Sequence, residues 1–299
     1  MPDGGPLVVG AAPPAADDGF EGGPDEILSF WEACAEAWHS AGSPWRPSAG
    51  DVAAYRRLAG SRLGGRVLVL GVTPELRDLV ADAGGRAVVL DVSPAMYAAA
   101  TAVLRHADAA DETWIQDDWF DAPFPAGEFD LVVGDMIWWA VSVSNQHVLR
   151  EAIHAALKPK GRLVSRFRFA DPTRAGQNAV PTFREHLRLL DADPAGEQVL
   201  RGALYSWLYD HTADGRSKRL DQRRAQALVL DIAATHEFSR YETYLRGLAD
   251  RLRGPDWTSQ SRADLLGIVC ASFDIEREEH AEDYDSGFYP VVALKPQLR

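Results

Sequence analysis

The stretch GRVLVLGVTPELRDLVADAGGRAVVLD, residues 65–91, decides the fold of this chain. It holds two short apolar runs, Val67–Leu70 and Ala87–Leu90, that are rich in β-branched residues. Between them, apolar residues with helical spacing lead to Gly84-Gly85. Runs this short, bounded by glycine, predict buried strands rather than helices. The stretch therefore predicts a strand–helix–strand unit within a buried parallel sheet.

The carboxyl ends of these two strands predict a nucleoside-cofactor site. Gly71 follows the first strand and lets the backbone approach a ligand closely. Asp91 ends the second strand and can accept hydrogen bonds from a ribose. Ligands of open parallel sheets bind at this edge. A dinucleotide loop would offer several glycines to a pyrophosphate, whereas Val72-Thr73-Pro74-Glu75 adds an anion and so favours a cationic cofactor without phosphate.

The bulk composition excludes several classes of function. The 299 residues carry a net charge of −13 with a pI near 5.0, which argues against nucleic acid as the main partner. Cys34 and Cys270 are isolated, so they predict neither a metal site nor a disulfide framework, but buried thiols in a reducing cytoplasm. No apolar run has the length of a membrane span, and no segment resembles a signal peptide.

Further runs along the chain predict the rest of the sheet. Glu112–Trp119, Phe129–Asp135 and Arg162–Phe169 read as three more strands. Phe273–Glu279 and Phe288–Leu294 read as an antiparallel pair added to a parallel sheet. Between these two groups we expect no convincing strand over residues 171–253, only helices. Those helices are expected at Thr182–Leu190, Gly196–Leu208, Leu220–Glu237 and Arg240–Leu252.

These elements predict a single domain preceded by a tail. We expect a disordered tail over 1–24, N-terminal helices over 25–62, a cofactor-binding core over 63–170, a helical insertion that caps the substrate over 171–256, and a final helix with a hairpin over 257–299. Within the first helices, the prolines that flank Trp45 and Arg46 hold both residues in an extended link just before the core.

Four separate motifs carry a family likeness in their order and spacing. They are VLVLGVTPEL, VVLDVSPAM, IQDDWFDAPFPAGEFDLVVGDMIWW and LREAIHAALKPKGRLVSR. Over residues 65–169 the chain resembles a class I S-adenosylmethionine-dependent methyltransferase. The resemblance implies an α/β fold with a Rossmann-like, seven-stranded methyltransferase sheet of five parallel strands plus a C-terminal β-hairpin. It also implies S-adenosyl-L-methionine as the cofactor.

The resemblance implies which residues hold this cofactor. Gly71, Val72 and Thr73 would lie under the methionine part, and Asp91 would bind the ribose. Val92 and Met96 would flank the adenine, and Asp118 (or its neighbour Asp117) with Trp119 would meet the adenine amino group. Gly134, Asp135 and Met136 would border the reaction centre. From the residues themselves, Glu75 suits the cofactor's ammonium and Arg46 its carboxylate.

The first loop departs from the family pattern, which is GxGxG. Gly71 stands alone before Val72-Thr73-Pro74-Glu75. Three interpretations stay open at this point. A shortened loop can still present amides to the cofactor's carboxylate with Glu75 turned away, the cofactor can bind in a shifted pose, or the site can be degenerate.

The catalytic candidates are His147, Tyr205 and Tyr209, with His211 as a further histidine near the insertion. A general base is needed only if the acceptor is protonated at rest. Core packing explains the neighbouring aromatic residues equally well as a substrate pocket does. We expect a methyltransferase that acts on a small molecule in specialised metabolism. The alternatives are an enzyme that cyclises or cleaves the bound sulfonium, and a non-catalytic binding protein. We expect no metal, nucleic acid or membrane partner, and pairing of two copies stays open.

Overall fold

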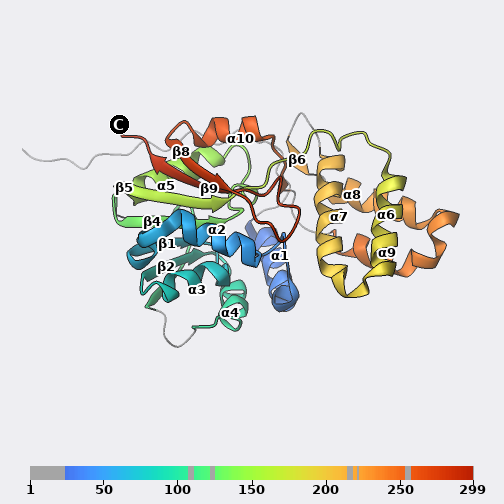
Figure 1. Ribbon diagram of the computed structural model, residues 1–299, viewed down its shortest axis with the longest axis horizontal. Coiled ribbons are helices and arrows are strands. Elements are labelled where there is room, and N and C mark those ends of the chain that lie inside the picture. The colour runs from blue at the N-terminus through green and yellow to red at the C-terminus, as the bar shows by residue number, and fades with distance from the viewer. Residues whose placement is uncertain are drawn as a thin grey trace, which may run out of the picture.

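A seven-stranded sheet in the order β3-β2-β1-β4-β5-β9-β8 organises this computed structural model and lies in the left part of Figure 1. The structure describes residues 24–106, 111–121, 125–213, 218–220, 222–252 and 257–298. The expected tail thus lies outside the described residues, apart from Pro24. The strands are β1 Arg66–Leu70, β2 Arg86–Asp91, β3 Glu112–Gln116, β4 Phe129–Asp135, β5 Leu157–Arg166, β8 Phe273–Glu279 and β9 Val291–Pro296.

The pairing of these strands confirms the predicted sheet. β1 pairs in parallel with both β2 and β4, and β3 and β5 extend the sheet in parallel on either side. β9 is antiparallel to both β5 and β8. The strand order reverses between β1 and β4, which is where parallel sheets of this kind bind their ligands.

The alternation of side chains along β1 shows how the sheet is buried on both faces. Val67 and Val69 pack with residues of α2 and α3, while Leu68 and Leu70 pack with residues of α5 and α10. A strand sends successive side chains to opposite faces, so both faces need apolar residues here. This is why the run reads as continuously apolar in the sequence.

Ten α-helices are found in the described residues. They are α1 Pro24–Ala37, α2 Ala49–Ala59, α3 Pro74–Asp82, α4 Pro94–Thr101, α5 Gln146–Ala156, α6 Ala179–Ala192, α7 Glu197–Thr212, α8 Gln222–Ala233, α9 Glu242–Asp250 and α10 Arg262–Val269, with short 3-10 turns at Trp38–Ser40, Gly60–Gly64, Pro194–Gly196 and His236–Tyr241. Helices α6 to α9 form a group beside the sheet, at the right of Figure 1. Each helix expected between residues 171 and 253 is therefore present.

Two strand boundaries and one short strand pair show where the structure differs from the sequence prediction. β3 ends at Gln116, because Asp117 and Asp118 already turn the chain. β5 begins at Leu157, because this residue pairs with Phe129 before an irregularity in the ladder. The region expected to lack strands contains β6 Arg219–Leu220, which pairs with β7 Trp257–Thr258. A two-residue pair has no periodicity that a sequence can display.

Candidate active site

Gly71 and Asp91 face one space at the carboxyl edge of the sheet. Gly71 has a φ of +83°, which favours glycine, and its N–H donates to the carbonyl of Leu90 at 2.9 Å. A Cβ built on Gly71 would lie 3.7 Å from the Trp119 ring and 3.9 Å from a carboxylate oxygen of Asp91. The structure therefore brings together the glycine and the acid that the sequence predicted as cofactor residues.

Trp119 borders the same space. Its indole N–H donates to the carbonyl of Leu90 at 3.0 Å, so the last peptide of β2 accepts hydrogen bonds from both Gly71 and the indole. The ring consequently lies beside Gly71, over the edge where β1 and β2 end. A ligand bound at Gly71 would therefore either contact the Trp119 ring or displace it.

The Asp91 carboxylate is poorly solvated. One oxygen accepts the Ser93 N–H at 2.8 Å, the only hydrogen bond found for it among the described residues. Burial raises the pKa of Asp91 from its ordinary value to about 6, with the Ser93 N–H acting in the other direction. An under-satisfied carboxylate here is suited to accept hydroxyl groups.

The residues expected around the adenine lie in two places. Asp118 accepts the Phe120 N–H at 3.0 Å, and burial raises the pKa of this carboxyl group. Asp117 accepts the Asp118 N–H at 2.9 Å. Val92 is half-buried next to Asp91, whereas Met96 packs in the core between α4 and the sheet. Asp118 thus lies next to Trp119, the residue that borders Gly71, whereas Met96 lies among packing residues.

An ion pair lies where the loop after β1 enters α3. Arg46 donates from Nε and Nη2 to the same oxygen of Glu75, at 2.9 and 2.6 Å, and from Nη1 to the Trp38 carbonyl at 3.4 Å. The two side chains are only 16% and 20% exposed. The other carboxylate oxygen, Glu75 Oε2, is buried and has no hydrogen-bond partner in the part of the chain that the structure describes. The site therefore contains an unsatisfied carboxylate oxygen.

A buried arginine that is not among the predicted site residues links the ends of β4 and β5 to the N-terminal part of the chain. Arg166, at the end of β5, binds both oxygens of Asp135 at 2.8 Å and one oxygen of Asp51 at 2.8 Å. It also donates to the Pro44 carbonyl at 2.6 Å and to the Tyr284 hydroxyl at 3.1 Å. Burial opposes its charge, but Asp135 and Asp51 outweigh burial and raise the pKa of Arg166. Asp135 is thus an ion-pair partner here and not a free base.

Tyr55 completes this edge. Its hydroxyl accepts the backbone N–H of Arg166 at 2.7 Å and donates toward the Gly134 carbonyl, 3.0 Å away. Met136 follows with a φ of +51°, and its N–H donates to the Arg166 carbonyl at 3.0 Å. Together with the contacts of Arg166, these bonds hold α2 and the segment around Pro44 against the ends of β4 and β5. The arginines within the apolar run Arg162–Phe169 are unusual for a buried strand, but this pattern does not identify their partners.

The three catalytic candidates are not brought together. His147 is exposed at the start of α5. Tyr205 and Tyr209 lie on α7 among other aromatic rings. Tyr205 donates to the Leu248 carbonyl at 3.1 Å, and burial raises its pKa to about 12. Burial also raises the pKa of Tyr209, so both phenols stay protonated at neutral pH and are poorly suited as bases.

His211 and Asp210 do not form a dyad. Asp210 binds the buried Arg168 at 2.6 Å and Arg174 at 3.3 Å, and His211 Nδ1 lies 3.0 Å from the Arg174 carbonyl. Since Arg168 follows β5 and Asp210 lies in the last turn of α7, this second ion cluster links the helical group to the sheet.

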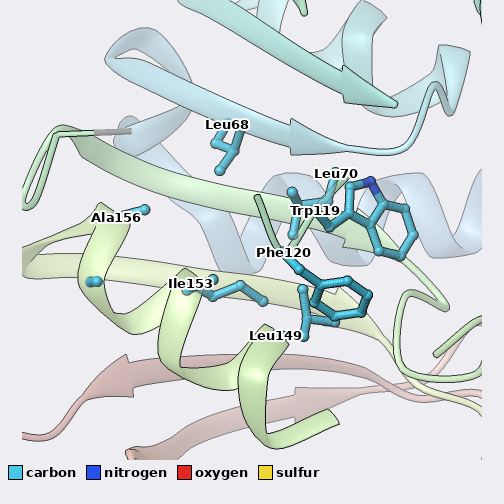
Figure 2. A pocket seen from close by; sticks show the side chains of 9 residues that line it. Leu68, Leu70, Trp119, Phe120, Leu149, Ile153 and Ala156 are labelled. Atoms are coloured by element: carbon cyan, nitrogen blue, oxygen red, sulfur yellow. The ribbon is translucent and has the colours of Figure 1, made fainter. Parts of the chain in front are cut away.

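A cavity of about 200 Å³, lined by apolar side chains, lies on the opposite face of β1 from α3. Figure 2 shows Trp119 and Phe120 projecting between β1 and α5, where they border it. The lining residues are Leu68, Leu70, Trp119, Phe120, Leu149, Ala152, Ile153, Ala155 and Ala156. Trp119 therefore contacts both this cavity and the crevice at Gly71.

Within the described ranges, no group of three or more His, Cys, Asp or Glu side chains is placed to hold a metal ion. In the same part of the chain, none of the helices combines the length and apolarity that a bilayer crossing requires.

Sequence comparison identifies the central part of the chain. A family model described as a methyltransferase domain matches residues 71–161, from the loop after β1 into β5. The resemblance seen in the sequence is therefore confirmed. No curated protein is significantly similar to the chain.

Solved structures share the fold along nearly the whole chain. DhpI superposes in a DhpI–SAH complex with a TM-score of 0.53 and 16% identity, over 92% of this chain and 97% of that one. A DhpI–SAM–HEP complex gives 0.51 and 20%, over 91% and 97%. A Rhodobacter sphaeroides protein described as a Zn-dependent alcohol dehydrogenase gives 0.59 and 15%, over 92% and 100%. These likenesses show a common fold, which by itself does not fix the reaction.

Proposed function

We propose that this chain, which carries a methyltransferase domain on the class I fold, transfers the methyl group of S-adenosylmethionine to a small molecule. The free oxygen of Glu75 carries the proposal. Glu75 lies within electrostatic range of Asp135, so the edge near α3 groups three carboxylates (Asp51, Glu75, Asp135) with two guanidinium groups (Arg46, Arg166). Those five side chains leave one negative charge, which an ammonium group would neutralise.

The remaining groups fit the other parts of this cofactor. Asp91 is placed to accept the ribose hydroxyls. Gly71 has no side chain, so the cofactor can approach the backbone there. Arg46 is a donor for the carboxylate of the methionine part. The complexes of DhpI with SAH and SAM, which share this fold, support the choice of cofactor.

The reaction needs little covalent chemistry from the protein. The acceptor's lone pair attacks the methyl carbon in line, the S–CH₃ bond breaks with its electron pair going to sulfur, and S-adenosylhomocysteine leaves. An acceptor that was protonated at rest passes its proton to water. The chain's own contribution is then to position both partners. We assign the wall of the acceptor chamber to the helical insertion, residues 171–256, and place the protein in the cytoplasm.

One observation favours a second candidate function, a binding protein without catalysis. The Trp119 ring lies beside Gly71, against the space that the cofactor would use. Isothermal titration with S-adenosylhomocysteine and with S-adenosylmethionine decides first, since failure to bind either compound would rule out the enzyme. Incubation with S-adenosylmethionine alone, followed by analysis for methylthioadenosine, then tests for cleavage of the sulfonium.

Replacing Asp91 by alanine should weaken S-adenosylhomocysteine binding by about 1–3 kcal/mol, because two charge-assisted hydrogen bonds to the ribose are lost. Isothermal titration measures this loss. Asp130→Ala, at the opposite edge of the sheet where Asp130 binds Lys158 and the Arg66 N–H, is the matched control and should bind as the wild type does. Equal affinity in wild type and Asp91→Ala would refute the ribose assignment.

The affinity should also fall as the pH is lowered. Asp91 has a raised pKa of about 6, so its carboxylate is ionised above that pH and becomes protonated below it. If only the ionised form accepts both hydroxyl groups, binding at pH 5.5 is about fourfold weaker than at pH 7. Titrations from pH 5.5 to 8 measure the profile. Asp91→Asn should bind weakly with a flat profile, and a wild type without pH dependence would contradict the assignment.

A further inference from the structure

Five aromatic side chains from four separate segments form one cluster beside the crevice. The Trp45 ring lies 5.5 Å from the Trp139 ring, 5.7 Å from Tyr209 and 6.3 Å from Tyr205, measured between centroids. Trp139 in turn stacks on Trp257 at 4.5 Å. We call Trp45, Trp139, Tyr205, Tyr209 and Trp257 the aromatic cluster. Four of the five are buried, and Trp45 is the member that stays partly exposed.

The aromatic cluster connects the crevice to the helical insertion. Trp45 is bonded to Arg46, whose guanidinium group holds Glu75 at the start of α3. Trp139 lies four residues after the end of β4, and its backbone N–H donates to the Met136 carbonyl. Tyr205 and Tyr209 come from α7. A molecule against Trp45 and Trp139 would therefore lie between the methionine end of the crevice and α7.

The polar groups of the aromatic cluster define the chemistry that it can recognise. Trp139 is only 8% exposed, and its indole N–H has no hydrogen-bond partner in the part of the chain that the structure describes. A buried donor without an acceptor is costly, so a ligand that supplies the acceptor is favoured. The Arg168 guanidinium already lies over the Tyr209 ring, 5.9 Å from its centroid. Both features favour an oxygen lone pair over a second cation.

We propose that the aromatic cluster binds a planar aromatic molecule whose substituent oxygen accepts a hydrogen bond from Trp139 Nε1. Stacking and edge contacts with Trp45 and Tyr209 would hold the ring. Trp139 Nε1 is buried and Trp45 is the partly exposed member of the aromatic cluster, so the molecule would enter beside Trp45 and displace its ring to reach this donor. This inference rests on the proposed function only in naming the bound molecule as the methyl acceptor, because the binding site itself does not depend on the cofactor.

Two probes with the same ring test this chemistry. 2-Naphthoate offers carboxylate oxygens, and 2-naphthylmethylammonium offers a cation in nearly the same position. We expect 2-naphthoate to bind at least tenfold more tightly, measured by tryptophan fluorescence and isothermal titration with and without S-adenosylhomocysteine. The net charge of −13 favours the ammonium probe non-specifically, so the opposite preference must come from the site. Tighter binding of the ammonium probe, or binding of neither, would overturn the proposal.

A pair of variants locates the donor. Trp139→Phe keeps an aromatic ring and removes the N–H, and should weaken 2-naphthoate about tenfold, in line with one lost hydrogen bond to a charged group. Trp138→Phe is the matched control. The Trp138 N–H is also buried without a partner, but its ring packs on Phe167 in the core cluster that contains α5. Equal losses in both variants would contradict the assignment of Trp139.

The outcomes separate this inference from the proposed function. Thermal denaturation checks that each variant folds, and the comparison of the two probes on the wild type needs no variant. Binding of 2-naphthoate by a protein that fails to bind S-adenosylhomocysteine would refute the cofactor and keep the aromatic site. The reverse result would refute the aromatic site alone.

Discussion

Replacing Arg166 by methionine should lower the free energy of unfolding by about 3–5 kcal/mol, the largest change in stability that we expect from a single substitution in this chain. Asp51 and Asp135 are both buried and both bind this guanidinium group. Without it, two carboxyl groups are left without a cation in a region that excludes water. Urea denaturation followed by circular dichroism measures the loss.

Two further variants show whether the loss comes from uncompensated charge. Arg57→Met removes an arginine that is 54% exposed and pairs with Glu279, and should change stability by about 1 kcal/mol at most. Adding Asp51→Asn and Asp135→Asn to Arg166→Met should restore part of the stability, because the neutral amides no longer need a cation. If Arg166→Met is no less stable than Arg57→Met, the buried network does not hold the N-terminal helices on the sheet.

The sheet could be predicted because its signals are local. The runs at Val67–Leu70 and Ala87–Leu90 are too short for helices and too apolar for an exposed edge, and they form neighbouring strands as expected. The β6–β7 pair was missed because Arg219–Leu220 and Trp257–Thr258 show no period and meet only after the helical insertion has folded. The pattern of apolar residues predicts a helix or strand well when the element is longer than about one repeat of that pattern.

The crevice could be predicted in part for a similar reason. Parallel strands end at one edge, so Gly71 and Asp91 had to come close together once the strands were recognised. The ion pairs that surround the crevice gave no such signal. Arg166 lies 115 residues from Asp51, and Arg168 lies 42 from Asp210, so nothing in the local sequence links either arginine to its partner.

The sequence predicts the roles of Arg46 and Glu75 only in part. The charge of each predicts a contact with the cofactor, but the structure pairs them with each other across 29 residues. One Glu75 oxygen is used by Arg46, and the other has no partner among the described residues. The pair therefore has the composition expected of a site for a zwitterion, with one donor group and one unsatisfied acceptor.

Replacing Glu75 by glutamine should weaken S-adenosylhomocysteine binding by about 1.5–3 kcal/mol, or roughly 10- to 150-fold, because a charged hydrogen bond to the ligand's ammonium group is lost. Methylthioadenosine lacks the ammonium and the carboxylate, so its affinity should stay within about twofold of the wild-type value. Isothermal titration of both ligands against both proteins gives the comparison.

The contrast between these two ligands distinguishes recognition from structural damage. Loosening of the loop after β1 would weaken both ligands, since both share the adenosine part. Glu128→Gln is the matched control, because Glu128 is similarly buried at 18% exposure and pairs with Arg66, but precedes β4 at the opposite edge of the sheet. Equal weakening of both ligands by Glu75→Gln would show that Glu75 holds the loop and does not bind the ammonium. Selective loss of S-adenosylhomocysteine would instead mean that this loop recognises the methionine end with an anion where the family pattern has glycine.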